Sequence, residues 1–439
     1  MLYRQKKNTF IKNHNGRGYI INSDTLADRT VDESGTVFLF AITRKPQTIE
    51  QLVDKLLEVF VGVERSVILP DACAFYDRLV TEGFLVKGEN ESELDACDTT
   101  FNYDYENRKT NERSQINFYI PGFDLKFLNF YRSMISYMSE FSYRFMENIK
   151  IPAFYGSFNN MIWNGGRLRL GRQPSFDEMR KAIEDVNNMG VAVRYTYTNC
   201  TLDDKNLNDT FCNLSMELAN NGKNEVLVNS PVLETYLRKN FPNFKYILST
   251  TACERDVNKI NEATKKYDLV VIDWRDNKNM NFLEKLEDKN KIEILINEKC
   301  PSACKIRKMH YELASKQICY KMPASECPAF DCLRSKADTK GFYRCLKNSL
   351  DTNLTHSELY GKYYDMGFRH FKIVGRNEDD YLSELESYIY YMASPECRDI
   401  VRYDLLGIYM DYVIDSFGGN RNKALQWYAE KLDKNKNHN

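Results

Sequence analysis

Residues 269–296 read LVVIDWRDNKNMNFLEKLEDKNKIEILI and contain two short, nearly continuous apolar runs, Leu269–Ile272 and Ile292–Ile296. Runs of the same kind recur on either side, at Pro152–Tyr155, Val191–Tyr197, Glu225–Val228, Tyr246–Ser249 and Phe371–Val374. Stretches with helical spacing of apolar residues lie between most of the runs, at 176–189, 202–220, 254–265 and 356–366. Apolar strands that alternate with helices indicate a parallel sheet covered on both faces.

The residues that follow the apolar runs indicate how this sheet closes. The chain has no glycine-rich dinucleotide-binding turn, and polar residues gather directly after the runs, where barrel enzymes place their sites. We therefore predict an α/β fold built on a TIM-like (β/α)8 barrel, with allowance for irregularity. Seven strands are visible in the sequence. The irregular segment 318–350 is the candidate for the eighth.

Length and charge limit the possible classes of protein. A chain of 439 residues exceeds what one hydrophobic core usually supports, so two domains are expected. Lys and Arg number 61 against 62 acidic residues, so no overall field favours nucleic acid or a membrane surface. No apolar run reaches the roughly 18 residues of a spanning helix. The opening MLYRQKKNTFIKNHN does not follow a signal-peptide pattern. We expect a cytoplasmic protein without nucleic-acid or membrane partners.

Six of the twelve cysteines fall between residues 297 and 345, directly after the run Ile292–Ile296. Cys300 and Cys304 form one close pair, and Cys327 and Cys332 form a second. Two close pairs joined by a longer excursion are typical of tetrahedral thiolate sites that hold zinc or an iron–sulfur cluster. Cys319 and Cys345 leave the choice of ligands open. The alternative is a set of inert, buried thiols.

Polar residues that could bind a substrate follow several of the predicted strands. They are Trp163, Asn164, Gly165, Gly166, Arg167, Asp273, Arg275, Lys372 and Arg376. Paired glycines allow a backbone to approach a ligand closely, and an arginine can grip a carboxylate with two N–H groups. If the first and last strands are neighbours, Arg167 and Arg376 converge on one anion. The alternative is that these residues are ordinary caps and tight loops. No catalytic acid–base pair can be assigned.

The first part of the chain has a different pattern. Residues 9–22 read as two short strands around a turn at Asn15–Gly16, and Thr36–Phe40 is a further apolar run. Helical stripes follow at 49–57 and 72–80. We predict a small α+β, winged-helix-like domain at 1–90, a polar linker at 91–122, and a long helix followed by the barrel at 123–425. The long helix is expected over 123–148.

This order of elements, ending in YDRLVTEGFLVKG at 76–88, resembles the small peptide-recognition domain of the pyrroloquinoline-quinone chaperone (PqqD) family. The resemblance covers about residues 8–88. It implies that the domain recognises the leader of a ribosomally synthesised precursor peptide, bound as an added strand at a sheet edge. A plain winged-helix accessory domain is the alternative.

The barrel part carries a second resemblance. GFRHFKIVGR at 367–376 and CPSACKIR at 300–307 look like signatures of the collagenase-like peptidase family of unknown catalytic type, over about residues 150–395. Family members that hydroxylate without oxygen hold a 4Fe–4S cluster on four cysteines at one end of a barrel. The resemblance implies cluster ligation by Cys300 and Cys304, with Cys327 and Cys332 as completions. The spacing beyond the first pair departs from the family pattern.

Together the two resemblances imply iron–sulfur-dependent modification of a ribosomally made peptide, such as oxygen-independent hydroxylation, with a possible partner maturase. One alternative is a non-catalytic peptide-binding scaffold with a structural metal such as zinc. A peptidase is a further alternative, although no Gly-x-Ser-x-Gly or His-Glu-x-x-His pattern supports it. A radical S-adenosylmethionine enzyme is disfavoured, because Arg307 occupies the place of the third cysteine in its C-x-x-x-C-x-x-C signature.

Overall fold

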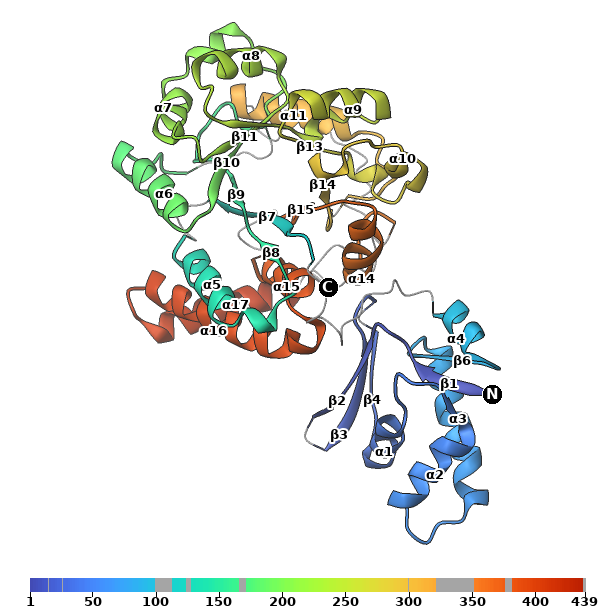
Figure 1. The fold of residues 1–439 in the computed structure, drawn as a ribbon. Helices are drawn as coiled ribbons and strands as arrows, with labels where there is room; N and C mark the ends of the chain where they lie inside the picture. Colours follow the sequence, from blue (N-terminus) through green and yellow to red (C-terminus); the bar gives the residue numbers. More distant parts are fainter. Residues whose placement is uncertain are drawn as a thin grey trace. The chain divides into compact units, whose positions relative to one another are not determined.

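The computed structural model describes residues 1–14, 16–25, 27–98, 113–123, 128–165, 171–298, 300–320, 351–375 and 381–436. The chain forms two compact units (Figure 1). Unit 1 comprises Met1–Asn111 and Thr355–Asp365, and unit 2 comprises Glu112–Leu354 and Met366–Asn439. Each unit is described by itself.

Unit 1 combines two small antiparallel sheets with helices. One sheet has the order β2-β3-β4, and the other has the order β5-β1-β6. The strands are β1 (Leu2–Gln5), β2 (Thr9–His14), β3 (Arg17–Asn22), β4 (Asp28–Thr30), β5 (Gln47–Thr48) and β6 (Leu85–Gly88). The helices are α1 (Glu33–Ala41), α2 (Ile49–Val59), α3 (Arg65–Thr81) and α4 (Glu91–Cys97).

The β2–β3 hairpin turns between His14 and Arg17, where the turn was predicted, although Asn15 lies outside the described residues. His14 pairs with Arg17, and Gly16 has a φ of +82°, which a residue without a Cβ adopts at little cost. The apolar run Thr36–Phe40 belongs to helix α1 rather than to the sheet. The side chain of Asp32 accepts the Gly35 N–H at 2.8 Å and starts this helix.

Segment Thr355–Asp365 completes unit 1 from far along the chain. The backbone N–H of Ser357 donates to Asp24 Oδ1 at 3.2 Å, and the Ser357 hydroxyl donates to Asp24 Oδ2. Asp24 and Ser357 are both buried. A buried carboxylate needs hydrogen-bond donors, and Ser357 supplies two of them to Asp24. Segment Thr355–Asp365 is therefore a structural part of unit 1.

Unit 2 is a closed parallel barrel of eight strands, as predicted (Figure 1). Around the barrel, the ring runs β7-β9-β10-β11-β12-β13-β14-β15 and closes by parallel pairing of β15 with β7. The strands are β7 (Ile116–Phe123), β9 (Ala153–Gly156), β10 (Ala192–Tyr197), β11 (Glu225–Val228), β12 (Lys245–Leu248), β13 (Leu269–Val271), β14 (Ile292–Leu295) and β15 (His370–Lys372). A two-residue strand, β8 (Ile149–Lys150), pairs with the start of β7.

The eighth strand is β7, and its position corrects two expectations. All of β7 except Phe123 lies within 91–122, which was predicted to be a linker and also contains helix α4. The closed ring needs no strand from 318–350, of which residues 321–350 lie outside the described part. Pro121 interrupts the apolar pattern of β7, and the pairing with β9 shifts register between Pro121 and Phe123. This irregularity accommodates a residue that lacks a backbone N–H.

Helices surround the barrel strands in unit 2 (Figure 1). Those of eight residues or more are α5 (Leu128–Glu140), α6 (Phe176–Asn188), α7 (Thr210–Ala219), α8 (Pro231–Asn240), α9 (Val257–Lys266), α11 (Arg307–Tyr320), α15 (Tyr381–Met392), α16 (Arg398–Ser416) and α17 (Arg421–Lys436). Helix α5 is shorter than the predicted 123–148. In the described part of the chain, none of the helices has both the length and the apolar character needed to cross a bilayer.

The barrel interior contains a charged network near the amino ends of its strands. Arg194 pairs with Glu225 at 2.6 Å and with Glu293 at 2.5 Å, and all three side chains are almost completely buried. The Arg194 guanidinium also lies 3.6 Å from the centre of the Tyr119 ring. Arg194 carries its positive charge because the two carboxylates offset the cost of burial and raise its pKa.

Candidate functional site

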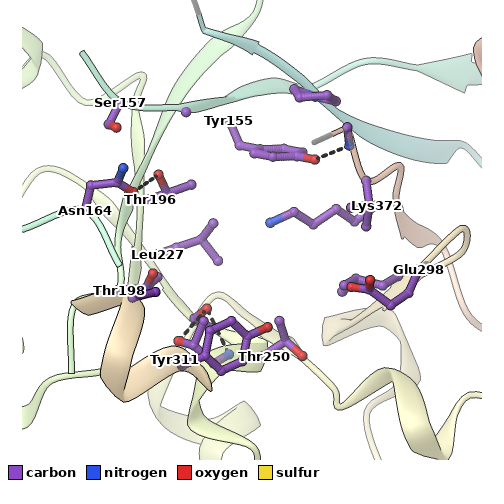
Figure 2. A pocket seen from close by; sticks show the side chains of 18 of the residues that line it. Tyr155, Ser157, Asn164, Thr196, Thr198, Leu227, Thr250, Glu298, Tyr311 and Lys372 are labelled. Carbon is purple, nitrogen blue, oxygen red and sulfur yellow. Dashed lines mark hydrogen bonds between the residues drawn. The ribbon is translucent and has the colours of Figure 1, made fainter. Parts of the chain in front are cut away.

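A cavity of about 180 Å³ lies at the carboxyl ends of the barrel strands (Figure 2). Strand ends supply Tyr155, Ser157 and Thr196, and helix α11 covers the cavity with Tyr311. The carboxyl ends of parallel strands meet at one rim, and this is where barrel folds place their sites. The polar residues that follow the predicted strands were expected at this same rim.

Lys372, predicted to bind substrate, lines this cavity. Only 8% of the residue is exposed, and Figure 2 shows its side chain pointing into the cavity. Its Nζ atom lies 4.1 Å from the centre of the Tyr155 ring. The Tyr155 hydroxyl donates to the Ile373 carbonyl at 2.7 Å, which fixes the ring beneath the ammonium group. The strand end therefore presents a positive charge in a largely buried position.

Arg307 connects the cavity with the cysteine-bearing loop. It lines the cavity and is 3% exposed. Its Nη1 donates to the Cys300 sulfur at 3.3 Å, and its Nη2 donates to Glu298 Oε2 at 3.2 Å. The Cys300 N–H donates to Glu298 Oε1 at 3.1 Å. Burial lowers the pKa of Arg307, but nearby Tyr311 and Glu298 outweigh this effect, so the guanidinium stays charged.

Cys300 is buried and Cys304 is half-buried, and both pack on the same apolar cluster inside the barrel. Asp273 and Arg275 hold the loop between the two cysteines. Arg275 donates to the Cys304 carbonyl at 3.2 Å and pairs with Asp273 at 2.6 Å. Neither Asp273 nor Arg275 lines the cavity. Their geometry is that of residues that position the loop.

The Trp163–Gly165 loop lies against the end of β10. Trp163 is fully buried, donates to the Asn206 carbonyl at 2.8 Å, and does not line the cavity. Asn164 does line it and accepts a hydrogen bond from Thr196 at 2.9 Å. A Cβ on Gly165 would lie 2.2 Å from the Thr198 carbonyl carbon. Gly165 is therefore required for close packing of two loops.

Five predicted site residues lie outside the described part of the chain: Gly166, Arg167, Cys327, Cys332 and Arg376. The expected convergence of Arg167 and Arg376 assumed that the first and last predicted strands are neighbours. This assumption is wrong, because β7 lies between β9 and β15. Among the residues with described positions, no three His, Cys, Asp or Glu side chains are grouped to hold a metal. The described pair Cys300 and Cys304 supplies at most half of a four-cysteine set.

Sequence reasoning did not select Ser157, Thr196, Glu298 or Tyr311 as site residues, although all four line the cavity. A signal existed for Ser157 and Thr196. Ser157 directly follows the first visible strand, and Thr196 alternates with apolar residues in VAVRYTY. Glu298 and Tyr311 had no comparable signal, because their place depends on how the loop after β14 returns to the barrel.

No protein family and no curated protein matches the chain. Two solved structures are similar to it. The first is a U32 peptidase, with 13% identity and a TM-score of 0.38, covering 62% of this chain and 96% of that one. The second is Streptococcus suis SuiB bound to S-adenosylmethionine, with 10% identity and a TM-score of 0.23, covering 64% of this chain and 67% of that one.

Proposed function

We propose that the barrel is an enzyme whose active site is the cavity at the carboxyl ends of its strands, with a 4Fe–4S cluster held beside it by the cysteine-rich stretch. One observation carries the proposal: Arg307 lines the cavity and also donates to the Cys300 sulfur. A single side chain thus connects a predicted ligand with the space where a substrate would bind.

The chemistry around Cys300 suits a metal ligand. A neighbouring cation favours the thiolate form of cysteine, which is the form that binds metals. Hydrogen bonds to ligating sulfurs are also a main means by which proteins adjust clusters. Cys304 packs on the same apolar cluster, which would shield a bound group from water. Cys327 and Cys332 are proposed as the remaining ligands from their spacing, and zinc is the alternative occupant.

A bound cluster would supply electron transfer at the cavity. The chain's own residues would hold the substrate through Lys372, Ser157 and the hydroxyls at the strand ends, while Arg307 orients Cys300. The reaction we propose is an oxygen-independent hydroxylation or related redox step on a ribosomally made peptide. Unit 1 would recruit the leader of that peptide and raise the local concentration of its core at the barrel.

The test is metal content. Protein purified without oxygen should be brown and contain about four irons per chain. Cys300→Ala and Cys304→Ala should each lose most of the iron and colour, whereas Cys73→Ala in unit 1 and Cys397→Ala should retain both. Circular dichroism would verify that each variant is folded.

Colourless wild-type protein with about one zinc per chain would instead indicate a structural metal. If Cys300→Ala retains its full iron content, Cys300 is not a ligand of the cluster. Hydrolysis of the precursor peptide by metal-free protein would favour the peptidase alternative.

A further inference from the structure

Trp274 carries a buried hydrogen-bond donor that the described residues leave unsatisfied. The residue follows strand β13 and is fully buried, and its indole Nε1–H has no hydrogen-bond partner in the described part of the chain. A buried tryptophan usually finds an acceptor for this group, because an unmade hydrogen bond in the interior is costly. Trp163 shows the usual case, since it is equally buried and donates to the Asn206 carbonyl at 2.8 Å.

The neighbours of Trp274 place this donor beside the cysteine-bearing loop. Arg275, the next residue, donates to the Cys304 carbonyl at 3.2 Å. The guanidinium carbon of Arg307 lies 5.2 Å from the centre of the Trp274 ring, and Nη1 of the same group donates to the Cys300 sulfur at 3.3 Å. A single arginine therefore connects Trp274 to each of the two predicted ligands.

The surroundings of the indole indicate what kind of acceptor fits. Trp274 and Cys300 belong to one apolar cluster inside the barrel, and Cys304 packs against it. Most of the other side chains in this cluster are aliphatic, so sulfur is the main acceptor that it offers. A thiol sulfur accepts hydrogen bonds weakly, whereas a negatively charged sulfur accepts them well. Metal-bound thiolates and the sulfides of an iron–sulfur cluster are sulfurs of the second kind.

We propose that the Trp274 indole N–H donates to a sulfur of the cluster bound at Cys300 and Cys304 and raises the reduction potential of that cluster. This inference rests on the proposed function and adds a residue that adjusts the cluster. Trp274 is not among the described residues that line the cavity. One-electron reduction adds a negative charge to the cluster. The donor stabilises this charge, so the reduced form gains more from the hydrogen bond than the oxidised form.

The test is the midpoint potential of the cluster in Trp274→Phe, which keeps an aromatic ring and removes the N–H group. Full-length wild type and variant, purified without oxygen and matched in iron content, would be titrated with dithionite in the presence of redox mediators. Electron paramagnetic resonance would quantify the reduced cluster. The variant should be about tenfold harder to reduce, which corresponds to a midpoint potential about 59 mV lower for a one-electron couple.

Trp163→Phe is the matched control, because Trp163 is just as buried but already donates to a backbone carbonyl. Its midpoint potential should equal that of wild type. Equal potentials for wild type and Trp274→Phe at equal iron content would overturn the proposal. An equal decrease in Trp163→Phe would also overturn it, because a general loosening of the barrel would then explain both shifts.

A second measurement uses the wild-type residue, so it does not depend on the folding of Trp274→Phe. Protein labelled with ¹⁵N at the indole nitrogen would be reduced and studied by pulsed electron paramagnetic resonance. A ¹⁵N coupling to the cluster should appear in wild type and persist in Trp163→Phe and Trp427→Phe, which leave Trp274 in place. Iron-loaded wild type without this coupling would contradict the hydrogen bond.

This inference and the proposed function fail in different ways. Brown protein with about four irons per chain, no ¹⁵N coupling and no response to Trp274→Phe would refute the role of Trp274 and leave the proposed function standing. Protein without iron would refute the cluster, and the role of Trp274 as its donor would fall with it.

Discussion

His370 lies at the start of β15, where its Nδ1 atom is 2.8 Å from the Tyr119 hydroxyl. Burial lowers the pKa of His370 to about 4, with Glu293 opposing this shift and Arg194 adding to it. The imidazole is therefore neutral at neutral pH. Burial also raises the pKa of Tyr119, so the tyrosine keeps its proton, and its hydroxyl forms a hydrogen bond with His370 Nδ1.

The lowered pKa makes the stability of the barrel depend on pH. Between about pH 6.5 and pH 4 the unfolded chain binds a proton at residue 370 that the folded protein does not. The free energy of unfolding should therefore fall as the pH falls through this window, by roughly 1–3 kcal/mol. Urea unfolding of wild type and His370→Gln at pH 7, 5.5 and 4.5 measures this contribution.

The His370→Gln protein should lose less stability than wild type between pH 7 and pH 4.5. A His370→Gln profile parallel to the wild-type profile would show that another group causes the dependence.

At the scale of elements, the loop at Trp163–Gly165 depends on one glycine. A Cβ at position 165 would lie 2.2 Å from the Thr198 carbonyl carbon and 2.4 Å from the Asn199 nitrogen. Backbone atoms cannot move aside as a flexible side chain can. Gly165→Ala should therefore lower the free energy of unfolding by about 1–3 kcal/mol or more and separate Asn164 from Thr196.

Gly407 provides the matched control for this prediction. It lies inside helix α16, and a Cβ there would meet nothing within 4 Å. Gly407→Ala should leave stability unchanged or raise it by up to about 1 kcal/mol, since alanine favours the helix. Thermal unfolding of Gly165→Ala, Gly407→Ala and wild type measures both effects on stability. Equal stability of Gly165→Ala and wild type would mean that the loop can shift without cost.

The barrel could be predicted from the sequence because seven of its strands are short apolar runs between helices. Strand β7 was missed, since Pro121–Gly122 interrupts its apolar pattern and a polar stretch precedes it. The run Thr36–Phe40 was not recognised as part of a helix for a related reason: an apolar run has the same composition in a buried strand and a buried helix. The signal that identifies a helix there is the N-cap at Asp32. It is a weak signal in a sequence because it consists of one residue.

The candidate site could be predicted only in part. Lys372 was found because it lies on a visible strand and points to the rim. Arg307 was noted only through a resemblance, and its contacts with Cys300 and Glu298 arise from a loop that returns to the barrel. Asp273 and Arg275 had the right location along the chain, but they pair with each other. Sequence position shows which rim a residue reaches and not what it faces.

At the scale of the whole molecule, the β2-β3-β4 sheet of unit 1 offers two edges for a peptide. Among the described strands, none pairs with the outer side of β2 or of β4. Gly18 and Val31 are hydrogen-bonded across β3 and β4, so the N–H of Thr30 points away from β3. By the same alternation the N–H of Asn13 points outward from β2. Either edge could pair with an added strand.

Proline substitution distinguishes the two edges in the full-length protein. Proline has no N–H to donate and is tolerated at an outer edge. If a leader peptide binds as an added strand, either Thr30→Pro or Asn13→Pro should weaken its binding by at least about tenfold with the fold retained. Fluorescence anisotropy with a labelled precursor peptide provides the measurement. Full binding by both variants would contradict strand addition in this sheet.

Segment Thr355–Asp365 belongs to unit 1 but is translated late. Both units can therefore complete their folding only near the end of translation. Front domains usually fold first as the chain emerges. Here the carboxylate of Asp24 meets its Ser357 donors only after translation has passed seven of the eight barrel strands. The last strand, β15, follows within a few residues. A nascent chain that stalls before residue 355 would therefore leave both units incomplete, and release of the last fifth of the chain completes them together.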